Sequence, residues 1–144
     1  MKELNIEFIL MNDYSGKGST TEEAIEDYKK GKTEFLAYHT EDGKTNLVIA
    51  NQLQYLFVTD LTIEEVNKQF STLLKLSINT VFDEVVEITS PYFEVTNDKL
   101  VAYVYVNGRF RILILDAANV TNIVMEPYAE NANPMELTNP NFIK

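Results

Sequence analysis

A weak internal repeat constrains the fold of this chain more than any other feature of its sequence. The segment AYHTEDGK at Ala37–Lys44 recurs as AYVYVNGR at Ala102–Arg109, and an apolar run follows each copy. Both copies place a turn-forming glycine between strand-like residues, which is the pattern of a β-hairpin. The repeat therefore predicts two similar antiparallel β-meander units. Hairpins also resemble one another without common origin, so duplication and chance similarity both stay open.

The second copy predicts its own pairing register. Asn107 and Gly108 supply the positive φ angles of a two-residue hairpin turn, which places Tyr105 opposite Phe110. Alternation then defines an expected core face made of Val101, Tyr103, Tyr105, Phe110, Ile112 and Ile114. The other face, which we expect to be partly covered, carries Val104, Val106, Arg109 and Arg111. When the same register is applied to the first copy, Leu47 and Ile49 correspond to Ile112 and Ile114. We therefore expect Leu47 and Ile49 on the core face of the first hairpin.

Two helices are expected between these strands. Thr20 and Glu23 form a capping-box pattern that predicts a short helix over about 21–30, with Gly31 as its left-handed cap. Thr62 and Glu65 predict a longer helix over about 62–76, which we expect to be the main helical packing element. Further strands are expected near 4–11, 33–39, 44–50, 54–59, 85–88, 93–95 and 121–125, whereas residues 12–19 are expected to form a loop.

These elements predict an α+β fold, with two similar β-meander units packed with the helix near 62–76 and the short helix near 21–30. The alternative is one continuous antiparallel sheet with the helices on one face. We expect a single compact domain over residues 1–126, in which 1–76 and 77–126 are candidate pseudo-repeats. Residues 127–144 hold three prolines without hydrophobic periodicity, so we expect an irregular C-terminal tail.

The charge of the chain limits its partners. With 22 acidic and 12 basic side chains the formal net charge is −10. Because phosphates require lysine and arginine, we expect no direct binding of nucleic acid. A basic protein is the electrostatically complementary partner.

The composition also indicates a compartment. The chain has no cysteine, which fits a reducing environment. Its N-terminal apolar stretch is interrupted by Glu7 and lacks a signal-peptide cleavage pattern, and no apolar run reaches membrane-spanning length. We therefore expect a cytoplasmic protein that does not contact a membrane.

No sequence motif indicates catalysis. The segment SGKGST has the strand-to-helix context of a phosphate loop, but Lys17 precedes Gly18 instead of standing directly before the serine. His39 is the only histidine, so a zinc, copper or haem site is not expected, and neither is any other cofactor. We interpret the chain as more consistent with a binding protein than with an enzyme.

Five residues are the candidates for binding a ligand or partner. Arg109 and Arg111 share a strand face beside the hairpin turn, where their guanidinium groups could bind a carboxylate. The alternative for both is a surface ion pair with one of the many acids. The remaining candidates are His39, Lys17 and Tyr14.

Three functional hypotheses follow. The first is a small acidic, non-enzymatic interaction module, such as an inhibitor or immunity-type protein, that acts on a basic partner. The second is a small-ligand-binding or enzymatic domain with a site between the two halves. The third is an assembly or scaffold subunit that self-associates through exposed strand edges.

Overall fold

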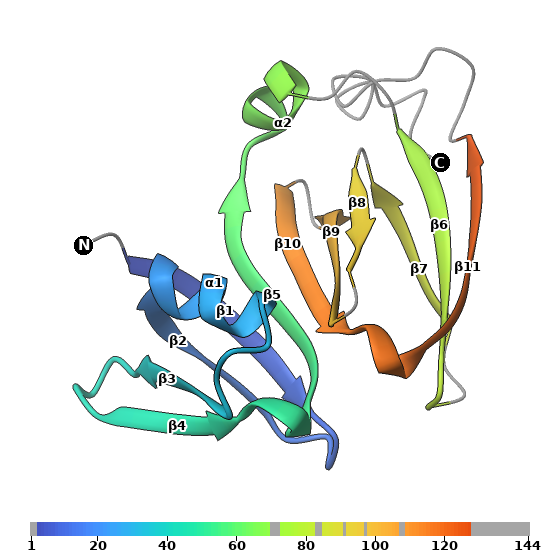
Figure 1. Ribbon diagram of the computed structural model, residues 1–144. Helices are drawn as coiled ribbons and strands as arrows, with labels where there is room; N and C mark the ends of the chain where they lie inside the picture. The colour runs from blue at the N-terminus through green and yellow to red at the C-terminus, as the bar shows by residue number, and fades with distance from the viewer. Residues whose placement is uncertain are drawn as a thin grey trace. The chain divides into compact units, whose positions relative to one another are not determined.

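The computed structural model of the protein describes residues 3–69, 73–82, 85–90, 92–96, 98–106 and 109–127. Within these ranges the chain is mostly antiparallel β-strand with two short α-helices, which agrees with the expected α+β class (Figure 1). The first half contains β1 (Glu3–Leu10), β2 (Ser15–Thr21), α1 (Glu22–Lys29), β3 (Phe35–His39), β4 (Thr45–Ile49), η1 (Ala50–Gln52) and β5 (Leu53–Leu61). The second contains α2 (Ile63–Gln69), β6 (Leu74–Thr80), β7 (Val85–Ser90), β8 (Phe93–Val95), β9 (Lys99–Val106), β10 (Arg109–Asp116), η2 (Ala117–Asn119) and β11 (Val120–Pro127).

The described chain forms two sheets and divides into two compact units. One sheet has the strand order β4-β3-β2-β1-β5-β10-β9-β8, and the other has the order β11-β6-β7. Unit 1 comprises residues 3–59, 95–101 and 113–118, and unit 2 comprises 60–94, 102–112 and 119–127. The expectation of a single domain over 1–126 with pseudo-repeats at 1–76 and 77–126 stays a prediction. Most of the expected tail lies outside the described residues.

Strand β2 corrects the expectation of a loop at residues 12–19. Only the turn around Asp13 is irregular, and Ser15–Thr21 pairs antiparallel with β1. The two glycines of β2 are required by packing. A Cβ on Gly16 would lie 2.5 Å from the Phe8 ring, and a Cβ on Gly18 would lie 2.4 Å from the His39 carbonyl oxygen. Glycine is therefore present in β2 because neighbouring strands approach it closely.

Helix α1 lies where the sequence predicts it but begins one residue later. The Thr21 hydroxyl, not that of Thr20, accepts a hydrogen bond from the Ala24 N–H (3.1 Å). Thr20 is buried in β2 and donates to the Ala37 carbonyl (2.7 Å). The helix packs against β2 and β3 and buries Ile25 and Tyr28 (Figure 1).

The β3–β4 hairpin has the turn that the sequence predicts, but its faces differ from the expectation. Gly43 adopts a φ of +81° in a turn closed by the Thr40 carbonyl. The register places Leu36 opposite Val48, and these two side chains are buried. Leu47 and Ile49 lie on the other face and are 60% and 52% exposed, so their assignment to the core was wrong. The registration failed because the first turn is longer than the two-residue loop expected in the second copy.

Helix α2 also departs from the sequence prediction. The Thr62 hydroxyl accepts from the Glu65 N–H (3.1 Å), as the capping pattern predicts. The helix ends at Gln69, however, and Leu74–Leu76 belong to β6. In unit 2, Val66, Leu73 and Phe110 form a buried cluster, against which pack Leu61, Tyr103 and Tyr105. Leu61, which precedes α2 in the chain, therefore packs against the cluster that contains Val66.

The β9–β10 hairpin agrees with its predicted register at the end far from the turn. The Ala117 N–H donates to the Asp98 carbonyl (3.0 Å), and Lys99 contacts Asp116. A two-residue loop would place Asp98 opposite Ala117 and Lys99 opposite Asp116, in agreement with these contacts. The burial pattern is different from the expectation, since Val104 is fully buried and Tyr103 is only half-buried. Both faces of this hairpin are therefore packed, and the turn residues themselves lie outside the described residues.

Candidate functional site

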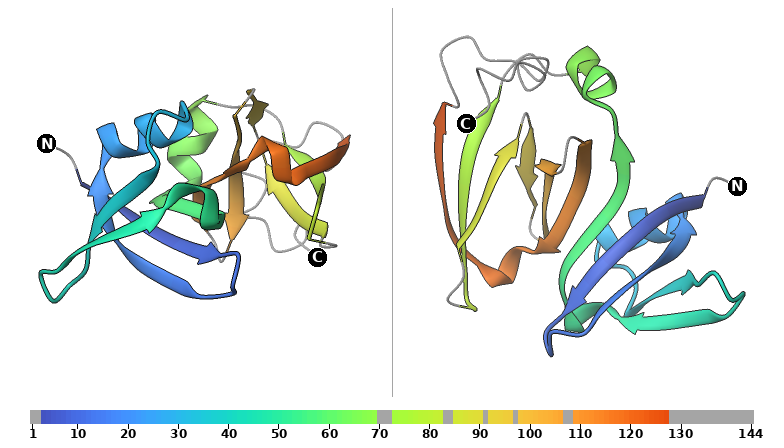
Figure 2. Two further views of the ribbon diagram at one scale, coloured as in Figure 1. Left: turned by 60° about the horizontal axis from the view of Figure 1, so that its bottom comes forward. Right: turned by 180° about the vertical axis from the view of Figure 1, so that it is seen from behind.

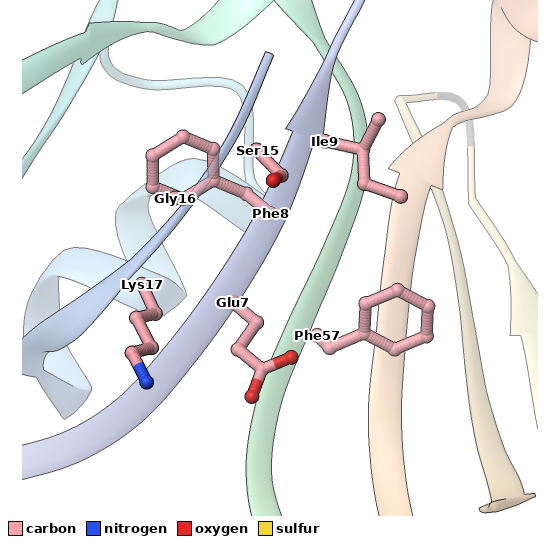
Figure 3. Close-up of a pocket in the computed structure, with 7 residues that line it drawn as sticks. All are labelled: Glu7, Phe8, Ile9, Ser15, Gly16, Lys17 and Phe57. Carbon is pink, nitrogen blue, oxygen red and sulfur yellow. The ribbon is translucent and has the colours of Figure 1, made fainter. Parts of the chain in front are cut away.

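Unit 1 contains an open groove on the outer face of strands β2, β1 and β5. The register places Lys17 opposite Glu7 and Glu7 opposite Phe57, so these three residues form a row across the three strands. Figure 3 shows Glu7 between Lys17 and Phe57. The groove has a volume of about 500 Å³ and is lined by Glu7–Ile9, Ser15–Lys17 and Phe57. We call it the Lys17 groove.

The Lys17 groove combines a charged side and an apolar side. The Lys17 side chain is exposed, and Phe57 and Ile9 supply partly buried apolar surface. Glu7 is exposed and has an interaction partner within the protein. The row therefore presents one cationic, one anionic and one apolar side chain to the groove, with Glu7 between Lys17 and Phe57 (Figure 3).

The structure distributes the five predicted site residues over both units. Tyr14, Lys17 and His39 belong to unit 1, and Arg109 and Arg111 belong to unit 2. Tyr14 is 59% exposed and lies in the turn between β1 and β2, where its N–H donates to Asn12 Oδ1 (3.0 Å). Arg109 is exposed, Arg111 is half-buried, and each has an interaction partner within the protein. Of the five, only Lys17 lines the groove.

His39 lies at the end of β3 and contacts a hydroxyl. Its Nδ1 is 3.1 Å from Thr45 Oγ1, and the two residues face each other across the hairpin. Both are exposed, so water competes for each group. Among the described residues no third group orients this pair as in a catalytic triad. We interpret the contact as a cross-strand hydrogen bond.

A buried ion pair in unit 1 was missed by the sequence reasoning. Lys99 Nζ lies 2.7 Å from Asp116 Oδ1, and the two side chains are only 9% and 22% exposed. The same ammonium lies 4.7 Å from the centre of the Tyr28 ring, which links α1 to β9 and β10 through a cation–π contact. The signal was present in the sequence, because the register around Asn107 and Gly108 places Lys99 opposite Asp116.

The Tyr28 phenol of this cluster is buried and has a raised pKa. Burial raises the pKa of its phenol far above the ordinary value, and the negative charge of Asp116 raises it further. The hydroxyl has no hydrogen-bond partner within the described part of the chain. Tyr28 is therefore a neutral core residue at physiological pH.

The sequence reasoning also missed an exposed apolar surface. Phe35, Leu47 and Ile49 lie on the outer face of the β3–β4 hairpin and are 46%, 60% and 52% exposed. Phe35 and Ile49 are directly opposite each other in the register. Strand β4 is the end strand of the larger sheet, and Figure 2 shows the β3–β4 hairpin (teal) from two further directions. Large apolar side chains on an exposed edge are typical of interaction surfaces.

The residues that the structure describes contain neither a metal-binding cluster nor a membrane-spanning helix. In that part of the chain, no group of three histidine, cysteine, aspartate or glutamate side chains could hold a metal ion. No helix there is long and apolar enough to cross a membrane.

No protein-family model, curated protein or solved structure matches the chain.

Proposed function

We propose that the protein is a small acidic, non-enzymatic interaction module that binds a basic protein. The observation that carries this proposal is the distribution of charge. By sequence, the ranges given above for unit 1 hold 12 acidic and 6 basic residues, and those for unit 2 hold 8 and 4, so the two units have net charges of −6 and −4. Such charge accelerates encounter with a basic partner and favours it over acidic ones.

Unit 1 also offers a specific acidic surface. Glu3 lies opposite Thr21 in the β1–β2 register, and Thr21 caps the helix whose first turn contains Glu22 and Glu23. All three carboxylates are exposed. We call this group the acidic end. Exposed carboxylates near one another can bind lysine and arginine side chains of a partner.

The role that we propose for this binding is inhibition or immunity-type neutralisation of the basic partner. Blocking a partner requires only a complementary surface, which the charge distribution supports. The proposed setting is the cytoplasm, with which the cysteine-free sequence is compatible.

The experiment compares two charge variants of equal net charge. In one, Glu3, Glu22 and Glu23 are changed to glutamine. In the matched control, the exposed residues Glu41, Glu64 and Glu87 are changed instead. Each variant and the wild type is used as bait in an extract of the native host, and captured proteins are identified. Circular dichroism checks that all three baits are folded.

We expect the wild type and the control to capture a basic protein, which is released by about 0.5 M salt because salt screens the attraction. The acidic-end variant should capture several-fold less. Equal loss from both variants would contradict a specific acidic end. Failure of every bait to retain a basic protein would contradict the proposed function itself.

The Lys17 groove favours a second candidate function, the binding of a small ligand. A carboxylate ligand with an apolar body would contact Lys17 and Phe57 together. A panel of such carboxylates is added to the wild type and to Lys17→Met, and amide chemical shifts of β1 and β2 are followed. Shifts that saturate in the wild type and vanish in Lys17→Met support this candidate. Identical responses of the two proteins would exclude it.

We further propose that the two meanders arose by duplication of one unit. Strand β1 lies between β2 and β5, and β6 likewise lies between β7 and β11. Short 3₁₀ helices, η1 and η2, follow β4 and β10 in the two halves. The similar order of elements supports the repeat that the sequence predicts.

A further inference from the structure

Strand β4 ends the larger sheet, and two hydrogen bonds determine which way its backbone groups point. The Ala50 N–H donates to the Glu34 carbonyl (2.9 Å), and the Thr40 N–H donates to the Lys44 carbonyl (3.1 Å). In an antiparallel pair, hydrogen-bonded and non-hydrogen-bonded residue pairs alternate. Both of these bonds join residues of even number, so the backbone groups of the even-numbered residues in β4 bond to β3. The N–H and C=O groups of Thr45, Leu47 and Ile49 consequently point away from β3, toward the open edge.

The residues with outward backbone groups are also the ones with exposed side chains. Leu47 is 60% and Ile49 is 52% exposed, and Thr45 is exposed as well. Natural sheets usually protect such an edge with lysine, proline or a bulge. The sequence of β4, TNLVI, contains no charged residue and no proline, and its register with β3 is regular. The edge is therefore open to an added strand.

We propose that this edge pairs with the β4 strand of a second copy of the chain. An antiparallel arrangement about a two-fold axis places Leu47 opposite Leu47 of the second copy and Thr45 opposite its Ile49. Each of these three opposed pairs exchanges two backbone hydrogen bonds, which gives six bonds and uses every outward group of both strands. A shifted antiparallel register would leave some of these groups unpaired.

The charged residues that flank β4 are complementary in the same register. Lys44 lies opposite Ala50 of the second copy, and Glu34, the residue before β3, is hydrogen-bonded to that Ala50 through the backbone. The small Ala50 side chain lets the lysine stem extend toward that glutamate, at a backbone separation of about 10 Å. Two symmetric Lys44–Glu34 ion pairs result. Lys44 now contacts Asp42 at 3.6 Å, and both groups are well exposed, so changing partner costs little.

The strength and salt dependence of this association follow from its size and charge. Five-residue strands bury a small area, so we expect a dissociation constant of about 0.1–1 mM. Two chains of charge −10 repel each other, and added salt should therefore strengthen the dimer. Binding to a basic partner should instead weaken with salt. The dimer is thus independent of the proposed function, and the two can be distinguished.

A single introduced cysteine tests the predicted symmetry axis. The chain has no cysteine, so the disulfide of a Leu47→Cys variant joins two copies. Directly opposed hydrogen-bonded residues have Cα atoms about 5.5 Å apart, which suits a disulfide. Val124→Cys is the matched control because Val124 is 52% exposed but belongs to β11 in the other sheet. We expect Leu47→Cys to form the covalent dimer at least ten-fold faster under mild oxidation. Equal rates would overturn the proposal.

Amide exchange of the unmodified protein gives a second test. From about 0.05 to 1 mM protein, the amides of Thr45, Leu47 and Ile49 should become protected, in step with a rise in mass measured by sedimentation. Asn46 and Val48 should not change, because they bond to β3 at every concentration. A protein that stays monomeric at 1 mM, or a dimer that leaves these amides unprotected, would overturn the proposal.

Charge reversal tests the register. Lys44→Glu should raise the dissociation constant by about two- to five-fold, and Glu34→Lys alone should also raise it. The double variant should return to the wild-type value. If Glu34→Lys strengthens the dimer because it merely lowers the net charge, the Lys44–Glu34 pair and the register built on it are wrong.

Discussion

The Lys99 ammonium lies 2.7 Å from the Asp116 carboxylate in the interior of unit 1. The two residues lie at the end of the β9–β10 hairpin that is far from its turn, and the ammonium also contacts the Tyr28 ring of α1. A buried charge is stable only when it is paired, because removing it from water costs several kcal/mol. This ion pair therefore couples segments that are remote in the sequence.

Removing one partner of the pair should be far more damaging than removing both. We expect Asp116→Asn to lower the free energy of unfolding by about 3 kcal/mol, because it leaves the Lys99 charge buried without a counter-charge. The double variant Lys99→Met/Asp116→Leu should recover to within about 1 kcal/mol of the wild type. Urea denaturation measures both values. A single variant as stable as the wild type would show that water reaches this site.

Gly18 should not tolerate alanine. A Cβ at this position would lie 2.4 Å from the His39 carbonyl oxygen and 2.7 Å from the Tyr38 ring, so β2 and β3 would have to separate. We expect Gly18→Ala to lower the free energy of unfolding by about 2–3 kcal/mol, as overpacking does in other cores. The neighbouring variant Ser19→Ala is the control and should cost less than about 1 kcal/mol. Similar losses for the two variants would argue against the close approach of the strands.

The contrast between β1 and β2 shows how far the sequence predicts this fold. In β1 the alternation of buried Ile6 and Phe8 with exposed Glu7 is readable, because the burial pattern repeats along the strand itself. In β2 the glycines suggest a loop, and the reason for them is the Phe8 ring and the β3 backbone. That information belongs to other strands, so no local pattern contains it.

The same limit explains the errors at α2 and in the binding surfaces. The apolar residues from Leu73 to Leu76 fit a helix as well as a strand, and pairing of β6 with β7 and β11 decides the outcome. Leu47 and Ile49 were assigned to the core from a turn length that the first hairpin does not have. Of the five predicted binding residues, only Lys17 lines the groove, and a binding role stays a prediction for all five.

The start of α1 can be tested with two adjacent threonines. Thr21→Ala removes the hydroxyl that accepts from the Ala24 N–H, and we expect a loss of about 1 kcal/mol together with faster exchange of that amide. Thr20→Val instead removes the hydroxyl that donates to the Ala37 carbonyl. It should lower stability to a similar extent but leave the Ala24 amide protected. If Thr20→Val exposes the Ala24 amide, the helix begins where the sequence predicted.

Asp42 should make the β3–β4 turn sensitive to acid. The Thr40 hydroxyl donates a hydrogen bond to the Asp42 carboxylate, and the Lys44 N–H donates another (3.2 Å). These bonds, the one from Thr40 first, lower the pKa of Asp42 from the ordinary 3.8. A group whose pKa is lower in the folded state stabilises the fold above its unfolded pKa and loses this effect as the pH falls through its folded pKa.

Asp42→Asn should therefore lower the melting temperature at pH 7 by a small amount, and the difference from the wild type should shrink below about pH 4. Asp42 is fully exposed, so the effect is smaller than that of the buried pair at Lys99. Melting curves of the two proteins between about pH 7 and pH 3 measure it, and Glu41→Gln, an exposed neighbour in the same turn, is the control. A difference that stays constant or grows as the pH falls would mean that Asp42 is not held in the turn as a carboxylate.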